Sequence, residues 1–311
     1  MREPERAARA YARRSGGAPF PLSERHGAWR VALDDDRTVD FTPLPGRIEE
    51  DLATRDFTIN AVAEKVGDSV VVDPFGGRAD LDRKRLRAVS DSIFMTDPLR
   101  LLRAVRLESE LAFRLDRDTE ELVRRDAGLV ARPSGERILA ELRRLWSPTD
   151  YKRLDALGLL GPLGGSLGRF PQANMVESPD YLLVVFFGEN ALRFPVPNDF
   201  RRFARTLLRA ERPPDSSPRS IHRFRRATEP WALEALAFLG ANEFADAVFR
   251  ARETAPKRPL VRGGELGLAE GPEVGRLLAE IEEERAAGTI STKEEALEYA
   301  RRHAGSVRGD G

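Results

Sequence analysis

RDFTINA, at residues 55–61, is the stretch that decides how this chain is interpreted. Two further motifs follow it, DPFGG at 73–77 and TDPLRLLRAVR at 96–106. Taken alone, the first stretch is typical of a helix start, with Asp56 as the cap and Arg55 in solvent. The later motifs favour a functional interpretation, so the segments around them need to be placed first.

The first 90 residues carry the patterns of both helices and strands. Residues 5–14 predict a helix that ends at the glycine pair following it. Residues 29–33 and 38–42 predict two short strands, joined by a turn of aspartates. A helical pattern covers 49–64, and a β-branched strand is expected at 69–72. This part of the chain is therefore expected to be mixed α and β.

From residue 91 onward the pattern is helical almost throughout. Thr96 and Asp97 are expected to cap a helix that has Pro98 in its first turn. Further helices are expected at 119–130, 135–146, 231–252, 272–287 and 292–303. The expected domains are 1–90, 91–150 and 151–311.

Composition limits the classes of protein to consider. The chain has 311 residues, 41% hydrophobic and 33% charged, which is enough to bury a core. Lys+Arg and Asp+Glu both number 51, so any nucleic-acid surface must be local. The absence of cysteine excludes disulfides and cysteine-based zinc sites, and no apolar stretch is long enough to span a membrane. We expect a cytoplasmic protein.

The order and spacing of the three motifs resemble the head domain of the class II tRNA nucleotidyltransferase and bacterial poly(A) polymerase family, which includes the CCA-adding enzymes. The resemblance implies an α+β fold, in which a nucleotidyltransferase (polymerase-β-like) α/β head precedes an all-helical neck, body and tail. It also implies an enzyme that adds CMP or AMP from CTP or ATP to RNA 3′ ends, with Mg²⁺ as cofactor and tRNA or another RNA as partner. The glycine pattern at 263–292 resembles the end of the body in bacterial members.

One part of the family pattern is missing. The family carries a glycine-rich GGxVRD turn and a paired-carboxylate DxD before the RDFTIN run, and this sequence starts too late to contain either. Two Mg²⁺ ions ~3.5–4 Å apart need such carboxylates. We therefore expect a truncated head that is inactive alone. Three explanations stay open: a start internal to a longer gene, a separate chain that supplies the segment, or a non-catalytic RNA-binding relative.

The resemblance assigns Arg55, Asp56 and Asn60 to the ribose and triphosphate of the nucleotide. An aspartate that accepts from a sugar hydroxyl selects ribose, and an arginine gives forked donors to phosphate oxygens. One departure is visible, because Thr54 stands where the family usually has a first arginine.

The third motif resembles EDxxR, which reads the base of the incoming nucleotide in the family. Asp97 would accept from an exocyclic amine and Arg100 would donate to the ring, which favours C and A. Arg103 and Arg106 are further nucleotide-binding candidates on the same helix. Thr96 replaces the usual glutamate. Without the resemblance, Asp97 and Arg100 would be an i,i+3 ion pair worth ~0.2–0.5 kcal/mol.

Asp40 is the candidate catalytic carboxylate and a possible third metal ligand. It lies in a predicted strand and precedes RDFTIN by about the family's distance. An ordinary outward-facing strand residue is the alternative. The aspartates at 34–36 are expected to form a solvated turn rather than a metal site.

Two motifs have both a functional and a purely structural interpretation. DPFGG, followed by Asp80, resembles the family's hinge, and a plain turn explains its glycines equally well. Glu136 and Arg137 resemble the neck motif that orders the template helix, and surface charge on an amphipathic helix is the alternative.

An arginine-rich stretch is the candidate RNA surface. Residues 201–226 contain nine arginines and two acidic residues, with phenylalanines and a histidine between them. Such a local excess of positive charge can follow a phosphate backbone, although a solvated helix has the same composition. The RNA-binding candidates are Arg201, Arg202, Arg205, Arg209, Arg223, Arg225 and Arg226.

Overall fold

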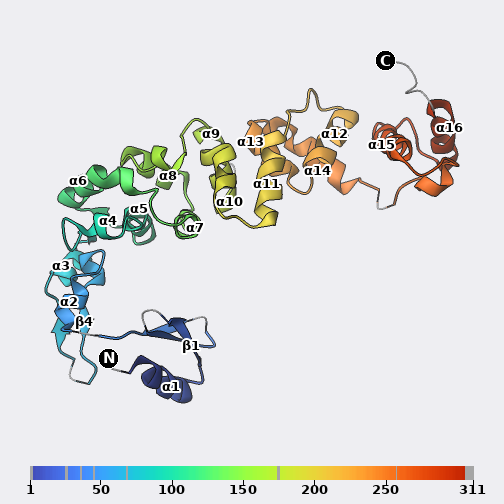
Figure 1. Cartoon of the computed structure of the whole chain (residues 1–311). Coiled ribbons are helices and arrows are strands. Elements are labelled where there is room, and N and C mark those ends of the chain that lie inside the picture. The colour runs from blue at the N-terminus through green and yellow to red at the C-terminus, as the bar shows by residue number, and fades with distance from the viewer. Residues whose placement is uncertain are drawn as a thin grey trace. The chain divides into compact units, whose positions relative to one another are not determined.

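The computed structural model describes residues 3–24, 27–35, 37–44, 46–67, 69–173, 176–256 and 258–304. They divide into two compact units, Met1–Pro133 and Ser134–Gly311. Strands occur in the first unit, whereas every regular element in the described part of the second is a helix (Figure 1). The predicted succession of a mixed α/β head and a helical remainder is confirmed. The three domain boundaries stay a prediction.

The first unit begins with helix α1 (Pro4–Ser15) and a three-stranded antiparallel sheet in the order β1-β2-β3. The strands are β1 (Ala18–Ser23), β2 (Ala28–Ala32) and β3 (Thr38–Phe41). Helix α1 packs on β2, where Ala8 and Ala12 meet the buried Val31. The sequence pattern did not predict β1 because it contains two prolines, which a sheet tolerates at an edge strand.

Short elements follow in the middle of this unit. They are α2 (Ile48–Leu52), the 3-10 helix η1 (Thr58–Asn60), β4 (Ala63–Glu64), β5 (Val71–Val72), α3 (Gly77–Asp82) and β6 (Arg85–Leu86). The single helix predicted over 49–64 was wrong beyond Leu52. The backbone there pairs with a distant segment instead: Thr58 N donates to Arg87 O (2.9 Å) and Val89 N donates to Asp56 O (3.2 Å).

The rest of the first unit is mainly helical. It contains α4 (Ile93–Thr96), α5 (Arg100–Glu110), β7 (Arg114–Leu115), which pairs with β6 in parallel, α6 (Arg117–Asp126) and the 3-10 helix η2 (Ala127–Leu129). Helix α5 begins two residues later than predicted. Asp97 lies between α4 and α5 in extended backbone (φ −144°, ψ 96°), so it belongs to neither helix.

The second unit is a succession of helices and 3-10 turns. They are α7 (Gly135–Leu142), α8 (Pro148–Ala156), η3 (Gly161–Leu163), α9 (Phe170–Ala173), α10 (Pro179–Phe187), η4 (Gly188–Arg193), α11 (Asn198–Arg209), α12 (Pro218–Thr228), α13 (Ala232–Leu239), η5 (Asn242–Phe244), α14 (Ala245–Glu253), η6 (Gly263–Glu265), α15 (Pro272–Ala286) and α16 (Lys293–His303). The helix predicted at 231–252 is two helices. Gly240 ends α13 in the left-handed conformation (φ 64°), which favours glycine.

Burial in the second unit follows its helical faces. Residues 181–187 of α10 are all buried, so this helix is apolar on every side. One apolar cluster joins α12, α13 and α14 around Phe224 and Leu236, and another joins α15 and α16 around Ile281 and Ala296. Within the described residues, no helix combines the length and the hydropathy needed to cross a bilayer.

Candidate nucleotide-binding site

Asp56 is the centre of the RDFTIN segment. It is only 5% exposed, and both of its carboxylate oxygens already accept hydrogen bonds. Its Oδ1 accepts from the Phe57 amide (2.9 Å) and from Asn60 Nδ2 (3.0 Å). Its Oδ2 accepts from Arg103 through both Nε (2.8 Å) and Nη2 (2.5 Å). A carboxylate has about four acceptor positions, so these four donors fill it.

The surroundings of Asp56 favour its charged form. Burial alone raises the pKa of this carboxyl, but the hydrogen bond from Asn60 and the charge of Arg103 outweigh burial and hold the pKa below its usual range. Asp56 and Arg103 therefore form a partly buried ion pair between the RDFTIN segment and α5.

Arg100 reaches the same segment as Arg103. Its Nη2 donates to Thr54 O (2.6 Å), and its Nη1 lies 3.4 Å from Thr96 Oγ1. Both arginines lie on α5 three residues apart, so they share a helix face and hold α5 against residues 54–56. These contacts bring the first and third motifs together, and the nucleotide roles of Arg100 and Arg103 stay predictions.

The expectation that Asp97 and Arg100 lie on one helix face was wrong. Asp97 precedes α5 in extended backbone, and its Oδ1 accepts from the Leu99 amide (3.3 Å). Its part in reading the base stays a prediction, since a residue outside the helix can still face a nucleotide.

The remaining nucleotide-binding candidates lie in different surroundings. Asn60 is exposed apart from its contact with Asp56, and the exposed Arg55 pairs with Asp51 (2.5 Å). Arg106 is 3% exposed, and its Nη1 lies 3.6 Å from Glu110 Oε2. Arg106 is therefore buried, and its contact with a nucleotide stays a prediction.

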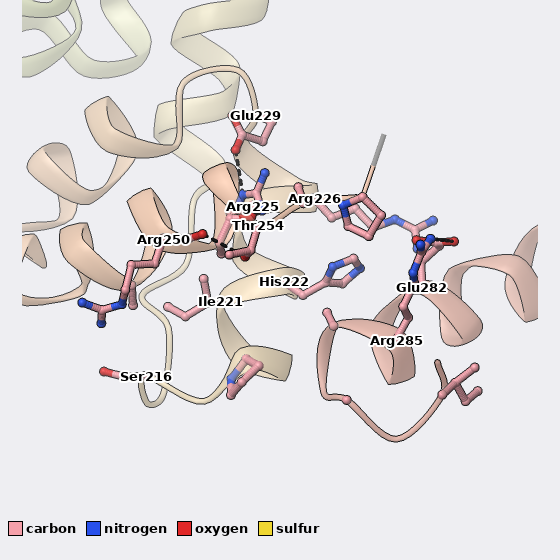
Figure 2. Close-up of a pocket in the computed structure, with 18 of the residues that line it drawn as sticks. Ser216, Ile221, His222, Arg225, Arg226, Glu229, Arg250, Thr254, Glu282 and Arg285 are labelled. Atoms are coloured by element: carbon pink, nitrogen blue, oxygen red, sulfur yellow. Dashed lines mark hydrogen bonds and ion pairs between the residues drawn. The ribbon is translucent and has the colours of Figure 1, made fainter. Parts of the chain in front are cut away.

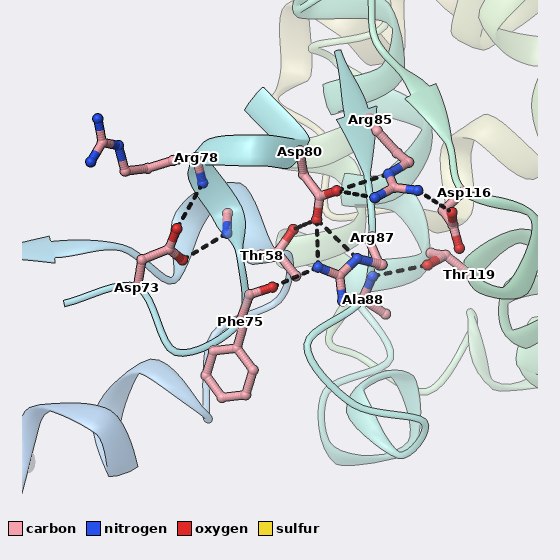
Figure 3. A network of polar contacts seen from close by, with 11 residues as sticks. Thr58, Asp73, Phe75, Arg78, Asp80, Arg85, Arg87, Ala88, Asp116 and Thr119 are labelled. Carbon is pink, nitrogen blue, oxygen red and sulfur yellow. Dashed lines mark hydrogen bonds and ion pairs between the residues drawn. The ribbon is translucent and has the colours of Figure 1, made fainter. Parts of the chain in front are cut away.

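A buried polar network lies beneath the RDFTIN segment (Figure 3). Asp80 of α3 is fully buried and accepts from Thr58 Oγ1 (2.7 Å), Arg85 Nη2 (2.5 Å) and Arg87 Nε (2.9 Å). Arg87 Nη2 also donates to Phe75 O (2.5 Å). Sequence reasoning assigned no role to Thr58, Arg85 or Arg87, although two arginines five and seven residues after an aspartate are a visible signal.

The DPFGG segment forms a turn that packs closely against Thr58 and the start of α3. The Asp73 carboxylate accepts from the amides of Gly77 (2.7 Å) and Arg78 (3.1 Å) and so caps α3. A Cβ on Gly77 would lie 2.0 Å from Thr58 O, which explains why this position has no side chain. Any hinge function of the motif stays a prediction.

Asp40, the possible third metal ligand, lies beside an arginine in the structure. Asp40 on β3 is paired with Arg30 through two hydrogen bonds (2.6 and 2.8 Å), and the bond from Arg30 lowers the pKa of Asp40. Asp35 pairs with Arg37 in a turn, and Asp36 lies outside the described residues. Within the described part of the chain, no three His, Asp or Glu side chains gather closely enough to hold a metal ion. The metal role of Asp40 stays a prediction.

Glu136 and Arg137 are exposed on α7, whose opposite face buries Ile138 and Leu139. This placement suits both interpretations of the neck motif, a surface that orders a neighbouring helix and ordinary surface charge.

The arginine-rich stretch is partly neutralised by distant acidic residues. At least five of its arginines form ion pairs outside the stretch: Arg202 with Asp199, Arg212 with Glu243, Arg219 with Glu284, Arg223 with Glu283 and Arg225 with Glu229. The interleaved phenylalanines 200, 203 and 224 are buried in the core and cannot stack on bases. Exposed charge remains on α11, where Arg202, Arg205 and Arg209 share one face and Arg201 is half-buried.

A cavity of about 740 Å³ opens among α12, α14 and α15 (Figure 2). It contains none of the motif residues of the head. His222 extends into it from α12 toward the side formed by Glu282 and Arg285, and burial lowers the pKa of its imidazole. Arg225 and Arg226 contribute to its lining, with Arg225 held by Glu229.

Residues 24–87 match the model of the poly A polymerase head domain. The chain belongs to the tRNA nucleotidyltransferase family. It is 31% identical to the A-adding tRNA nucleotidyltransferase of Deinococcus radiodurans, over 99% of this chain and 91% of that protein. It is 32% identical to the CC-adding tRNA nucleotidyltransferase of Thermus thermophilus, over 96% of this chain and 87% of that protein.

Solved structures show the same fold. A CCA-adding enzyme in complex with ATP matches with a TM-score of 0.79 at 19% identity, over 99% of this chain and 85% of that one. The Thermotoga maritima CCA-adding enzyme in complex with tRNA matches with a TM-score of 0.72 at 21% identity, over 96% of this chain and 84% of that one. The Deinococcus alignment spans 397 positions, more than the 311 residues of this chain, so that relative has residues within the aligned span that have no counterpart here.

Proposed function

We propose that this chain takes part in adding CMP or AMP, from CTP or ATP, to the 3′ end of tRNA. The observation that carries the proposal is the contact of Arg100 and Arg103 with residues 54–56, which joins two family motifs at one site. The named activities of the two relatives, A-adding and CC-adding, support nucleotide addition to tRNA and leave the choice between C and A open.

In this proposal each side chain of the head has a positional task. Arg55 gives forked donors to the triphosphate, and Asp56 with Asn60 recognises the ribose. The face of α5 that carries Arg100 holds this segment in place and, with Asp97 beside it, lies next to the base. Because protein groups rather than a template strand contact the base, selectivity depends on how firmly these groups are held.

Mg²⁺ would stabilise the negative charge that develops at the α-phosphate during nucleotidyl transfer. The described residues do not fit that ion, since Asp40 is paired with Arg30 and no cluster of carboxylates accompanies it. We therefore propose that carboxylates from outside the described residues, on a separate chain or an additional segment, complete the site. A non-catalytic RNA-binding relative is the second candidate, favoured by the same missing cluster.

The 311-residue chain alone is expected to bind ATP or CTP but to extend tRNA poorly. Two-metal clamping contributes several kcal/mol to the stabilisation of the transition state, and the described residues hold no cluster of carboxylates for it. The purified chain would be incubated with Mg²⁺, CTP, ATP and a tRNA that lacks its 3′ end, and products resolved on a denaturing gel. Robust extension would show that the metal site has been misjudged. Absence of nucleotide binding would contradict the proposed site itself and favour the RNA-binding relative.

RNA binding is expected to depend on the exposed face of α11. Replacing Arg202, Arg205 and Arg209 together with glutamate should weaken tRNA binding and flatten its salt dependence, because each lost phosphate contact lowers the slope by about one. Affinity would be measured by filter binding at several salt concentrations.

The chain offers a matched control for this experiment. Arg6, Arg9 and Arg13 have the same spacing on exposed positions of α1, in the other unit. Their replacement with glutamate changes the net charge equally and should leave the salt slope near that of the wild type. Equal losses in the two triple variants would mean that the α11 face is not the RNA surface.

A further inference from the structure

Thr58 and Asp80 connect the nucleotide-binding segment to the core of the first unit. Both are 0% exposed, and Thr58 Oγ1 donates to Asp80 Oδ2 over 2.7 Å. Thr58 lies between Asp56 and Asn60 in sequence, so its position governs both. We infer that Asp80 is a positioning residue for nucleotide binding, acting through the hydroxyl of Thr58. This inference rests on the proposed nucleotide-binding role of the segment.

Asp80 is itself held from several directions (Figure 3). Its Oδ1 accepts from Arg85 Nε (2.8 Å) and Nη2 (2.5 Å), and its Oδ2 accepts from Arg87 Nε (2.9 Å) as well as from Thr58. Arg85 is anchored in turn on Asp116 (3.3 Å) and Arg87 on Phe75 O (2.5 Å). The carboxylate therefore offers Thr58 an acceptor whose position is fixed by β6, by the 73–77 turn and by α6's cap residue.

Thr58 is fixed in three independent ways. Its hydroxyl bonds to Asp80, its amide donates to Arg87 O (2.9 Å), and its carbonyl lies against Gly77, where a Cβ would approach within 2.0 Å. Since Thr58 begins η1, these contacts set the turn that carries Asn60. Asn60 Nδ2 then reaches Asp56 Oδ1 over 3.0 Å.

The chemistry of the network fits a positioning task better than a stabilising one. A buried ion pair is often no more stabilising than well-packed apolar residues of similar volume. A hydroxyl bonded to a carboxylate is short, directional and stronger than a neutral hydrogen bond. The buried carboxylate therefore fixes the position of Thr58 through a directional hydrogen bond. A purely apolar contact is not directional and would fix that position less tightly.

The test separates the hydroxyl from the bulk of Thr58. Thr58→Val keeps the shape and removes the donor, whereas Thr58→Ser keeps the donor. Thr228→Val is the matched control, since Thr228 is also buried (1% exposed) and its hydroxyl donates to Phe224 O over 2.7 Å in the other unit. Dissociation constants for ATP and dATP would be measured by calorimetry, and melting temperatures by circular dichroism.

Thr58→Val is expected to weaken ATP binding roughly tenfold, the size of one charge-assisted hydrogen bond, and to reduce the preference for ATP over dATP. Thr58→Ser should restore most of both. Thr228→Val should lower the melting temperature without changing either nucleotide constant, because a purely structural loss does not alter the ratio.

The outcomes distinguish this inference from the proposed function. If the wild-type chain binds neither nucleotide, the proposed function fails and the inference falls with it. If the wild type binds ATP and Thr58→Val binds it equally well with an unchanged ratio, only the inference is overturned. If Thr58→Val does not fold, Thr58→Ala takes its place, because it removes the hydroxyl without adding a methyl group at that position. Wild-type ATP affinity in Thr58→Ala would overturn the inference in the same way.

Discussion

Asp80→Ala is expected to lower the free energy of unfolding of the first unit by about 3–5 kcal/mol. Asp80 is 0% exposed and pairs with Arg85 and Arg87, so its removal opens a small cavity and takes away the carboxylate that both guanidinium groups share, leaving Arg85 with its 3.3 Å contact to Asp116. Urea unfolding monitored by circular dichroism would measure the change. Asp82→Ala is the matched control, because Asp82 lies on the same helix α3 and is exposed. Its substitution should cost no more than about 0.5 kcal/mol.

The contribution of Asp80 should also depend on pH. Burial alone raises the pKa of Asp80, but the hydrogen bonds from Thr58, Arg85 and Arg87 hold it below its ordinary value. A carboxyl with a depressed pKa in the folded state contributes stability above the unfolded pKa of about 3.9, and that stability is lost as the pH falls through the folded value. The stability difference between the wild type and Asp80→Ala should therefore begin to narrow as the pH falls below about 4 and narrow further as the pH falls through the folded-state pKa. A difference that persists unchanged into acid would argue that packing, rather than charge, is lost.

Helix ends could be predicted where the deciding groups are local. The expected helix at 292–303 is found at Lys293–His303 because Thr292 Oγ1 accepts from the Glu295 amide (3.2 Å) and Glu295 Oε2 accepts from the Thr292 amide (3.0 Å). The helix expected over 49–64 failed because residues 56–58 bond to residues 87–89, which no local pattern reveals. Tertiary contacts there override the helical periodicity.

In the candidate site, too, the sequence predicted the residues but not the contacts between residues that are distant along the chain. The sequence placed Asp56, Asn60 and Arg103 in one site, and the structure brings them into contact. It could not show that Asp56 already has four donors, because Arg103 lies 47 residues away along the chain. The charge of the arginine-rich stretch was overestimated for a similar reason. The count of charges within 201–226 omitted Glu243 of η5 and the two glutamates of α15, Glu283 and Glu284, which form ion pairs with arginines of the stretch.

Breaking the Asp56–Arg103 pair from either side is expected to destabilise the first unit by about 3 kcal/mol or more. Arg103→Met leaves the 5%-exposed carboxylate of Asp56 without its cation, and Asp56→Asn removes the negative charge that pairs with Arg103. The double variant should cost much less than the two singles added together, since it leaves no uncompensated charge. A double-mutant cycle from urea unfolding would measure the coupling, and additivity within about 0.5 kcal/mol would contradict the pairing.

The same two variants should separate direct from indirect recognition of the ribose. All four acceptor positions of Asp56 are filled, so a ribose hydroxyl can bond to it only by displacing a donor. If Asp56 accepts from the ribose, Arg103→Met frees Oδ2, and the preference for ATP over dATP should survive or increase. Asp56→Asn should abolish that preference, because an amide oriented by Arg103 and Asn60 has only one acceptor oxygen where the carboxylate has two.

Loss of the preference in both variants would mean that Asp56 acts by holding Arg103 in place and that the arginine contacts the sugar. The ratio of the two dissociation constants decides between these cases, with Arg124→Met on α6 as the exposed control, whose ion pair with Glu120 is worth at most about 1 kcal/mol.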